Sequence, residues 1–204
     1  MLVALALAAA APTITAIDAE RAFSADAQKN GQWTAFKAWS TPDALMFTPQ
    51  PVKAHVFLKD RKDPPVAVFW WPGRSYISCD GSYAVNTGPW VREWGKSVGY
   101  FTTVWKRQPD GSWKWIFDAG DELKTARAEG GDIKPAVAAC SGKKLGMLMS
   151  PPRPGEVGGG KANDQSLVWR WSVAKDGART FEAWIWNGAR FERVIHDEVA
   201  AQSQ

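Results

Sequence analysis

Histidine and cysteine are scarce in this chain, with two of each among 204 residues. A Cys/His zinc site needs three or four such ligands at close spacing, and His55 and His196 lie far apart in the sequence. We therefore expect no metal site and no other cofactor. The same scarcity leaves little from which to build a Ser/His/Asp or Cys/His nucleophile.

The chain also lacks a block of charge. Its net charge is +4 and its isoelectric point about 9.1, but lysine and arginine are spread along it with no run beyond pairs such as Lys106-Arg107. Nucleic-acid binding calls for a concentrated basic stripe. We therefore expect no nucleic-acid partner.

Long hydrophobic runs are absent too. The apolar run from Leu2 to Ala11 is too short to span a bilayer, so we expect no membrane span, but it has the length of a signal peptide. A basic segment before it is missing, because Met1 leads directly into Leu2. We interpret residues 1–16 as a signal peptide and expect a periplasmic or secreted protein.

Export would place both cysteines in an oxidising compartment. There Cys79 and Cys140 are expected to form one disulfide. The alternative is two unpaired thiols.

Tryptophan, by contrast, is abundant, with 13 residues. Each such ring buries well over ~150 Å² when packed. The rings must fill a core and form cross-strand pairs, or they must line a pocket.

The apolar spacing predicts helices first and strands afterwards. Ala16, Ala19, Phe23 and Ala27 recur at helical spacing after a capping-box-like start at Thr15. A shorter helical stripe follows over residues 33–39. Strands are then expected at 44–48, 66–71, 74–79, 83–94, 98–107 and 112–119, with Asp-Gly at 110–111 as a hairpin turn. This order predicts an α+β fold, in which a curved antiparallel sheet wraps on the N-terminal helices.

The remainder differs in composition. Residues 123–162 are rich in glycine and proline and are expected to be a linker with one helical piece around 133–140. The spacing of Gly155 to Lys161 is that of a phosphate-binding loop, but Ala162 stands where a Ser or Thr is needed, so we interpret it as flexible linker. The pattern of residues 163–204 predicts a three-strand β extension. We expect it to dock on the main sheet, because three strands alone are only marginally stable.

Three motifs together resemble one known family. They are D-A-L-M-F-T-P at 43–49, S-x-D-G-x-x-A-x-x-x-G at 78–88 and V-W-K-R-Q-x-D-G-x-W-K at 104–114. Residues from about 15 to 122 resemble the SnoaL-like domains of the nuclear transport factor 2-like superfamily, and we place the domain itself at 17–122. The resemblance implies a cone-shaped α+β fold with a pocket. Its members include ketosteroid isomerase, scytalone dehydratase and polyketide cyclases, as well as non-catalytic binding or dimerising modules.

The resemblance implies a catalytic base at Thr48, and threonine cannot act as one. The remaining catalytic candidates are His55 near the expected pocket mouth, Tyr100 on a central strand, and Asp118. Strict alternation places Asp118 opposite the face of Trp113, Trp115 and Phe117, and hence outward if that face is core. We expect the pocket to be lined by these aromatic residues: Trp33, Phe36, Trp39, Phe47, Trp70 and Trp90.

Three functions remain open. The domain binds a small apolar or aromatic molecule in an aromatic pocket, or it is an enzyme of the isomerase, dehydratase or cyclase type. Alternatively it is a structural or dimerising module whose own side chains fill the cone. A homodimer is compatible with all three.

Overall fold

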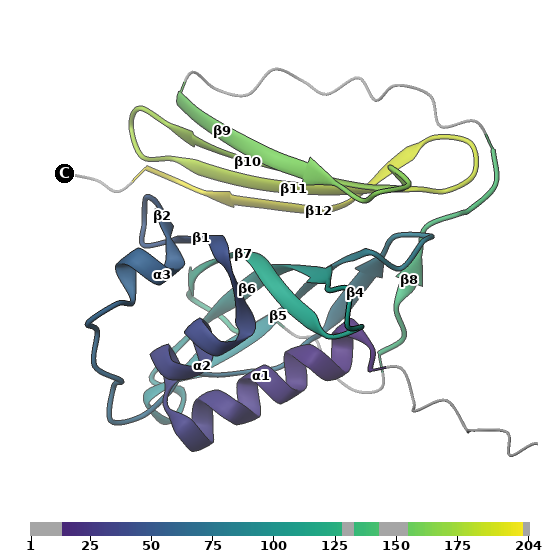
Figure 1. The fold of residues 1–204 in the computed structure, drawn as a ribbon. Helices are drawn as coiled ribbons and strands as arrows, with labels where there is room; N and C mark the ends of the chain where they lie inside the picture. Colours follow the sequence, from purple (N-terminus) through teal and green to yellow (C-terminus); the bar gives the residue numbers. More distant parts are fainter. Residues whose placement is uncertain (1–13, 128–132, 143–154, 202–204) are drawn as a thin grey trace, which may run out of the picture.

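Three layers make up the protein in a computed structural model, which describes residues 14–127, 133–142 and 155–201. Helices form the first layer, a strongly curved sheet the middle one, and a second, smaller sheet the third (Figure 1). Most of the expected signal peptide lies outside the described residues. Within the described part, no helix is long and apolar enough to cross a membrane.

The N-terminal helices form where the apolar spacing predicts them. Helix α1 spans Ala16–Asn30 and begins at a capping box, in which Thr15 and Asp18 each accept a hydrogen bond from the other's backbone N–H. It ends at Gly31, whose φ of 106° suits glycine. Helix α2 spans Gln32–Trp39, and the single turn α3 spans Ala54–Phe57.

The main sheet is eight-stranded and wraps around α1 and α2. Its order is β2-β1-β7-β6-β5-β4-β8, and β3 also pairs with β5. The long central strands are antiparallel, whereas β1 runs parallel to β7. This is the cone arrangement that the resemblance implied. The strands are β1 (Ser40–Phe47), β2 (Pro51–Lys53), β3 (Phe69–Trp70), β4 (Arg74–Ile77), β5 (Tyr83–Arg92), β6 (Ser97–Arg107), β7 (Trp113–Leu123) and β8 (Ala136–Val137).

Among the described residues the C-terminal sheet has four strands, not the three expected. They are β9 (Gly155–Lys161), β10 (Leu167–Ala174), β11 (Arg179–Trp186) and β12 (Phe191–Val199), in the order β12-β11-β10-β9. The interpretation of 155–161 as flexible linker was therefore wrong. Its glycines let the strand lie close to tryptophan rings, since a Cβ on Gly158 would come within 2.4 Å of the Trp171 ring.

The helical piece expected around 133–140 was also wrong. That segment is extended, and β8 adds to the main sheet by pairing with β4. The disulfide expected between Cys79 and Cys140 is present, with an S–S distance of 1.99 Å. It ties the segment after β8 to the loop after β4, and Ala139 N–H also donates to Trp186 O in the C-terminal sheet.

The main sheet is buried on both faces. Its inner face packs on the helices through Phe23, Trp105 and Trp115, and its outer face packs on the C-terminal sheet. The residues that meet in this second core include Val85, Val104, Phe117, Trp169, Trp171, Phe181 and Ile185. The C-terminal strands therefore dock on the main sheet, as expected, and the protein has one core on each side of it.

Candidate functional site

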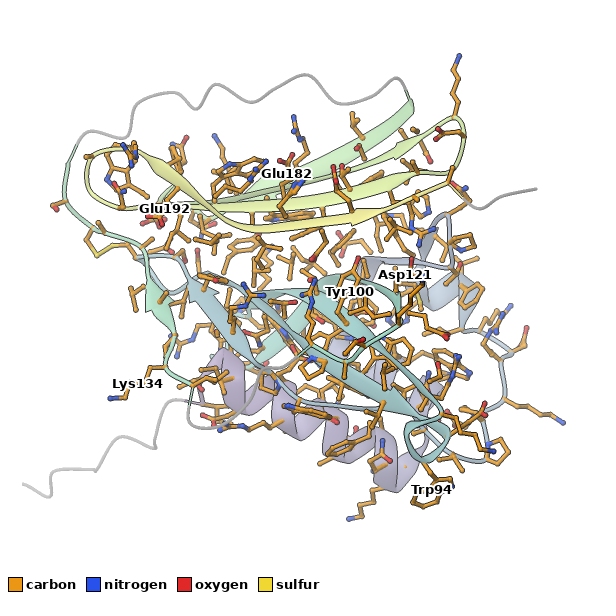
Figure 2. All side chains as sticks on the ribbon, turned by 180° about the vertical axis from the view of Figure 1, so that it is seen from behind. Trp94, Tyr100, Asp121, Lys134, Glu182 and Glu192 are labelled. Carbon is orange, nitrogen blue, oxygen red and sulfur yellow. A yellow bond between two sulfur atoms is a disulfide. The ribbon has the colours of Figure 1, made fainter. Side chains whose placement is uncertain are left out.

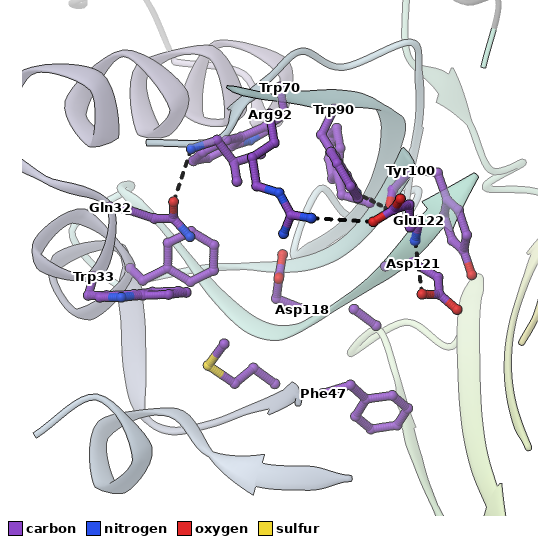
Figure 3. A pocket seen from close by; sticks show the side chains of 16 residues that line it. Gln32, Trp33, Phe47, Trp70, Trp90, Arg92, Tyr100, Asp118, Asp121 and Glu122 are labelled. Atoms are coloured by element: carbon purple, nitrogen blue, oxygen red, sulfur yellow. Dashed lines mark hydrogen bonds and ion pairs between the residues drawn. The ribbon is translucent and has the colours of Figure 1, made fainter. Parts of the chain in front are cut away.

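A cavity of about 360 Å³ lies at the wide end of the cone, between α2 and the ends of β5, β6 and β7 (Figure 3). Much of its wall is aromatic. Five of the six residues expected to line a pocket do so: Trp33, Phe36, Phe47, Trp70 and Trp90. Trp90 lies flat over the backbone of Gly99, where a Cβ would come within 2.3 Å of the indole, so this wall depends on a glycine.

A β-bulge in β7 turns Asp118 into this cavity. Val104 pairs with Phe117 and Trp105 pairs with Trp115, so Ile116 is an extra residue on β7. A bulge of this kind reverses the alternation of side chains beyond it. Trp115 and Asp118 consequently share the inner side, and Phe117 points into the outer core. The expectation that Asp118 faces outward was wrong for this reason.

The carboxyl of Asp118 is partly open to the cavity and otherwise enclosed by protein. Burial raises its pKa to about 7, and the negative charge of Glu20 acts in the same direction. A hydrogen bond of 2.7 Å from Thr103 Oγ1 opposes the rise. Near neutral pH this group therefore exchanges a proton readily.

A second buried carboxyl, Glu20 on α1, stands behind the cavity wall. Its Oε1 accepts from Trp70 Nε1 at 2.8 Å, and its Oε2 accepts from Trp105 Nε1 at 2.6 Å and from Asn86 Nδ2 at 3.2 Å. Burial raises its pKa to about 7 against these three donors. Because the Trp70 ring lines the cavity, Glu20 fixes the orientation of part of the wall.

Sequence reasoning missed Glu20, although a signal was present. The apolar stripe of α1 places position 20 on the same face as Ala16, Phe23 and Ala27. A lone acidic residue on such a face indicates a buried carboxyl with dedicated donors. Three N–H groups from Trp70, Trp105 and Asn86 provide them.

Tyr100 reaches the cavity at its edge. Its side chain lies on the outer face of β6, where the Arg127 guanidinium stacks on the ring at 4.0 Å from the centroid. Burial, chiefly, and then the nearby charges of Asp197 and Asp121 hold the pKa of its phenol well above the usual range. Tyr100 is thus a neutral hydroxyl at the point where the two sheets meet the cavity.

Charged residues gather at the cavity mouth. Arg92 and Glu122 form an exposed ion pair at 3.3 Å, and Asp121 precedes Glu122 on β7 and also lines the cavity. On the helix side, Gln32 Oε1 accepts from the backbone N–H of Val68 at 3.0 Å. The site is therefore apolar in its depth, with one titratable carboxyl, and polar at its opening.

Two expected site residues lie elsewhere. His55 does not line the cavity; it sits on α3 with Nε2 2.9 Å from Ser40 Oγ, because Ala54 and Leu58 anchor this turn against the core. Trp39 is partly buried against the inner core and does not line the cavity, and its indole donates to Asp26 at 2.9 Å. Among the described residues, no group of three or more His, Cys, Asp and Glu side chains could hold a metal ion.

The chain matches no family model and no curated protein. Similar solved structures include a ketosteroid isomerase-like protein from Parabacteroides distasonis, with 18% identity and a TM-score of 0.43 over 56% of this chain and 94% of that one. The S. rosetta CaMKII hub has 17% identity and a TM-score of 0.41 over 57% and 100%. A nuclear transport factor 2-like superfamily protein from Salmonella enterica has 17% identity and a TM-score of 0.37 over 56% and 94%.

Proposed function

We propose that the protein binds a small, flat, largely apolar or aromatic molecule in the cavity of its cone. The observation that carries this proposal is a space of about 360 Å³ walled largely by aromatic rings, with the carboxyl of Asp118 facing it. Pockets for small organic ligands combine an apolar wall with a few polar groups that fix orientation. The open space supports binding over a structural module whose rings fill the cone.

Asp118 supplies the polar recognition. With a pKa of about 7 it is partly protonated at neutral pH, so it can donate to a ligand carbonyl or accept from a ligand hydroxyl. The bond from Thr103 holds one carboxyl oxygen in place. A ligand with one such polar group on a flat apolar body matches this arrangement.

Binding is tested by titrating the protein with 2-naphthol, a neutral two-ring aromatic alcohol. Saturable binding is expected at one site per chain. Trp33→Ala should weaken it about tenfold, because a lost aromatic contact is worth roughly 0.5–1.5 kcal/mol beyond its buried area. Trp94→Ala is the matched control, since Trp94 is 92% exposed and does not line the cavity. Absence of binding, or equal losses in the two variants, would contradict the proposal.

A second candidate is an enzyme of the isomerase, dehydratase or cyclase type, and one observation favours it. A carboxyl with a pKa near the working pH is suited to general acid–base catalysis, and Asp118 is such a group facing a cavity. Asp118 would act as the catalytic base in place of Thr48, whose hydroxyl cannot act as one. Thr48 lies in the turn after β1 and does not line the cavity.

Proton transfer can be tested with 2-tetralone, a flat bicyclic ketone whose protons next to the carbonyl exchange for deuterium. Catalysed exchange, followed by NMR, should be lost in Asp118→Asn while 2-tetralone still binds. Glu122→Gln is the control, because Glu122 lines the same cavity at its exposed mouth. Binding without catalysed exchange would leave the protein a binding module.

We also propose that the protein is exported to the periplasm or secreted. The disulfide between Cys79 and Cys140 supports this, because such bonds persist in oxidising compartments. N-terminal sequencing of protein from its native host should begin between Ala11 and Asp18. Recovery of intact Met1 with both thiols reduced would contradict export.

A further inference from the structure

The cavity does not end at the main sheet. Strand β1 pairs with β7 only as far as Met46 opposite Asp118. Beyond that point the described chain places no strand on this side of β7. The cavity there adjoins a small void between the two sheets, and both share the walls Phe47, Tyr100, Ala119 and Gly120.

The far wall of this void belongs to the C-terminal sheet. Arg179, Phe181 and Asp197 line it, and Arg179 is only 7% exposed. Figure 2 shows Tyr100 and Asp121 at the level between the two sheets, close to this wall. The void itself holds about 20 Å³, which is room for about one water-sized group.

Arg179 has fewer close hydrogen-bond acceptors than a buried guanidinium usually has. In the part of the chain that the structure describes, the one side-chain acceptor within its reach is Asp121 Oδ2, at 3.5 Å. Arg127, nearby, contrasts with it, since that side chain donates to Asp197 Oδ1 at 2.5 Å and to Thr87 Oγ1 at 2.8 Å. Buried arginines are normally held by close acceptors, because the guanidinium stays charged and carries five N–H donors.

The partner of Arg179 is also easily replaced. Asp121 is 37% exposed, so its carboxylate can be solvated by water when another anion takes its place. A planar carboxylate that enters from the cavity can accept two parallel hydrogen bonds from the guanidinium fork. The hydroxyl of Tyr100 stands at the same junction and remains protonated.

We propose that Arg179 forms an anion subsite, so that the ligand of the cavity is a flat apolar molecule bearing a carboxylate. The apolar body lies among the aromatic rings, and the carboxylate reaches past Gly120 to Arg179, displacing Asp121. This inference rests on the proposed function. It gives the C-terminal sheet a part in binding.

The test compares 2-naphthoate with 2-naphthol, which have the same apolar body, by calorimetry at pH 6, where Asp118 is mostly neutral. Wild-type protein should prefer the naphthoate about tenfold, the range expected for hydrogen bonds to a charged group. Arg179→Gln should abolish this preference and leave 2-naphthol binding unchanged. Arg193→Gln is the control, because that arginine lies on the opposite face of the C-terminal sheet.

A second variant keeps the test decisive if Arg179→Gln fails to fold. Asp121→Asn frees Arg179 and should tighten 2-naphthoate several-fold without changing 2-naphthol. Glu122→Gln removes a neighbouring carboxylate that pairs with Arg92 and should have a smaller effect. Equal tightening in both variants would overturn the subsite.

The outcomes separate the two proposals. Binding of 2-naphthol with no preference for 2-naphthoate, or a preference that survives Arg179→Gln, would overturn the anion subsite and leave the proposed function intact. Failure of both probes to bind would overturn the proposed function and the subsite with it.

Discussion

Replacing Glu20 by glutamine should change the stability of the protein in opposite directions at low and high pH. The substitution keeps the shape of the side chain and exchanges one oxygen for an NH₂ group. Both oxygens of Glu20 accept hydrogen bonds, from Trp70 on one side and from Trp105 and Asn86 on the other. Whichever way the new amide turns, its NH₂ faces an N–H donor and cannot accept from it, whereas the hydroxyl oxygen of a protonated Glu20 still can. Leaving such buried donors unmatched costs about 1–3 kcal/mol of unfolding free energy.

The pH dependence follows from the raised pKa of Glu20. Burial raises that pKa from 4.5 to about 7 in the folded protein. As pH rises above 4.5, the unfolded chain loses the Glu20 proton while the folded protein still holds it, so stability falls. The fall is complete above pH 7 and amounts to about 3 kcal/mol, at 1.36 kcal/mol per unit of pKa.

Glutamine does not titrate, so Glu20→Gln escapes this loss. At pH 5 the variant should be less stable than wild type by about 1–3 kcal/mol, and at pH 8.5 it should be as stable or more stable. Urea unfolding of the oxidised protein, followed by tryptophan fluorescence between pH 5 and 8.5, measures the difference. Asp118 titrates in both proteins, and its pKa is lower in the variant because the charge of Glu20 is gone, which adds to the variant's relative stability at pH 8.5. Glu156→Gln, at an exposed position of β9, serves as the control.

One result would refute this reasoning. If Glu20→Gln loses the same free energy at pH 5 and at pH 8.5, the three donors hold Glu20 as a carboxylate across this range, and burial does not dominate its pKa.

Three further changes have definite expected results. Gly158→Ala should lower the melting temperature, because its Cβ would come within 2.4 Å of an indole ring. Replacing Cys79 and Cys140 by alanine should cost roughly 2–4 kcal/mol in urea unfolding, since the bond closes a loop across 61 positions. Thr103→Val removes the hydrogen bond that lowers the pKa of Asp118, so that carboxyl should titrate at higher pH in an NMR titration.

Matched measurements check each of these. Val157→Ala, on the same strand and 52% exposed, should leave the melting temperature nearly unchanged. Reductant should destabilise the wild-type protein as much as the double cysteine substitution and should not affect that variant. An unchanged Asp118 titration in Thr103→Val would show that this threonine does not act on the carboxyl.

The sequence predicted the inner, aromatic part of the site because that part follows from periodicity. The helical spacing of Trp33 and Phe36 turns both toward the cone. Strand alternation did not predict the carboxyl that gives the inner cavity its polarity. Asp118 faces inward only because Ile116 is inserted opposite β6, and no local signal in an apolar strand marks which residue is the extra one.

The C-terminal region was harder to predict because its conformation depends on partners. Gly155–Lys161 contains four glycines, which disfavour a strand, and it becomes β9 because these glycines fit against the rings of β10. His55 was placed wrongly because its neighbours decide its direction. Its position in the sequence suggested a pocket mouth, but burial of Ala54 and Leu58 holds the turn in another direction.

The position of the C-terminal sheet also restricts how copies of this protein can associate. Because that sheet covers the outer face of the main sheet within a single chain, the face is closed to a second copy. Self-association would have to use another surface. One is the outside of the C-terminal sheet along β12, where the side chains of Arg193 and Glu198 are 49% and 63% exposed. A contact there would be polar and salt-sensitive, and it would leave the cavity open to ligand.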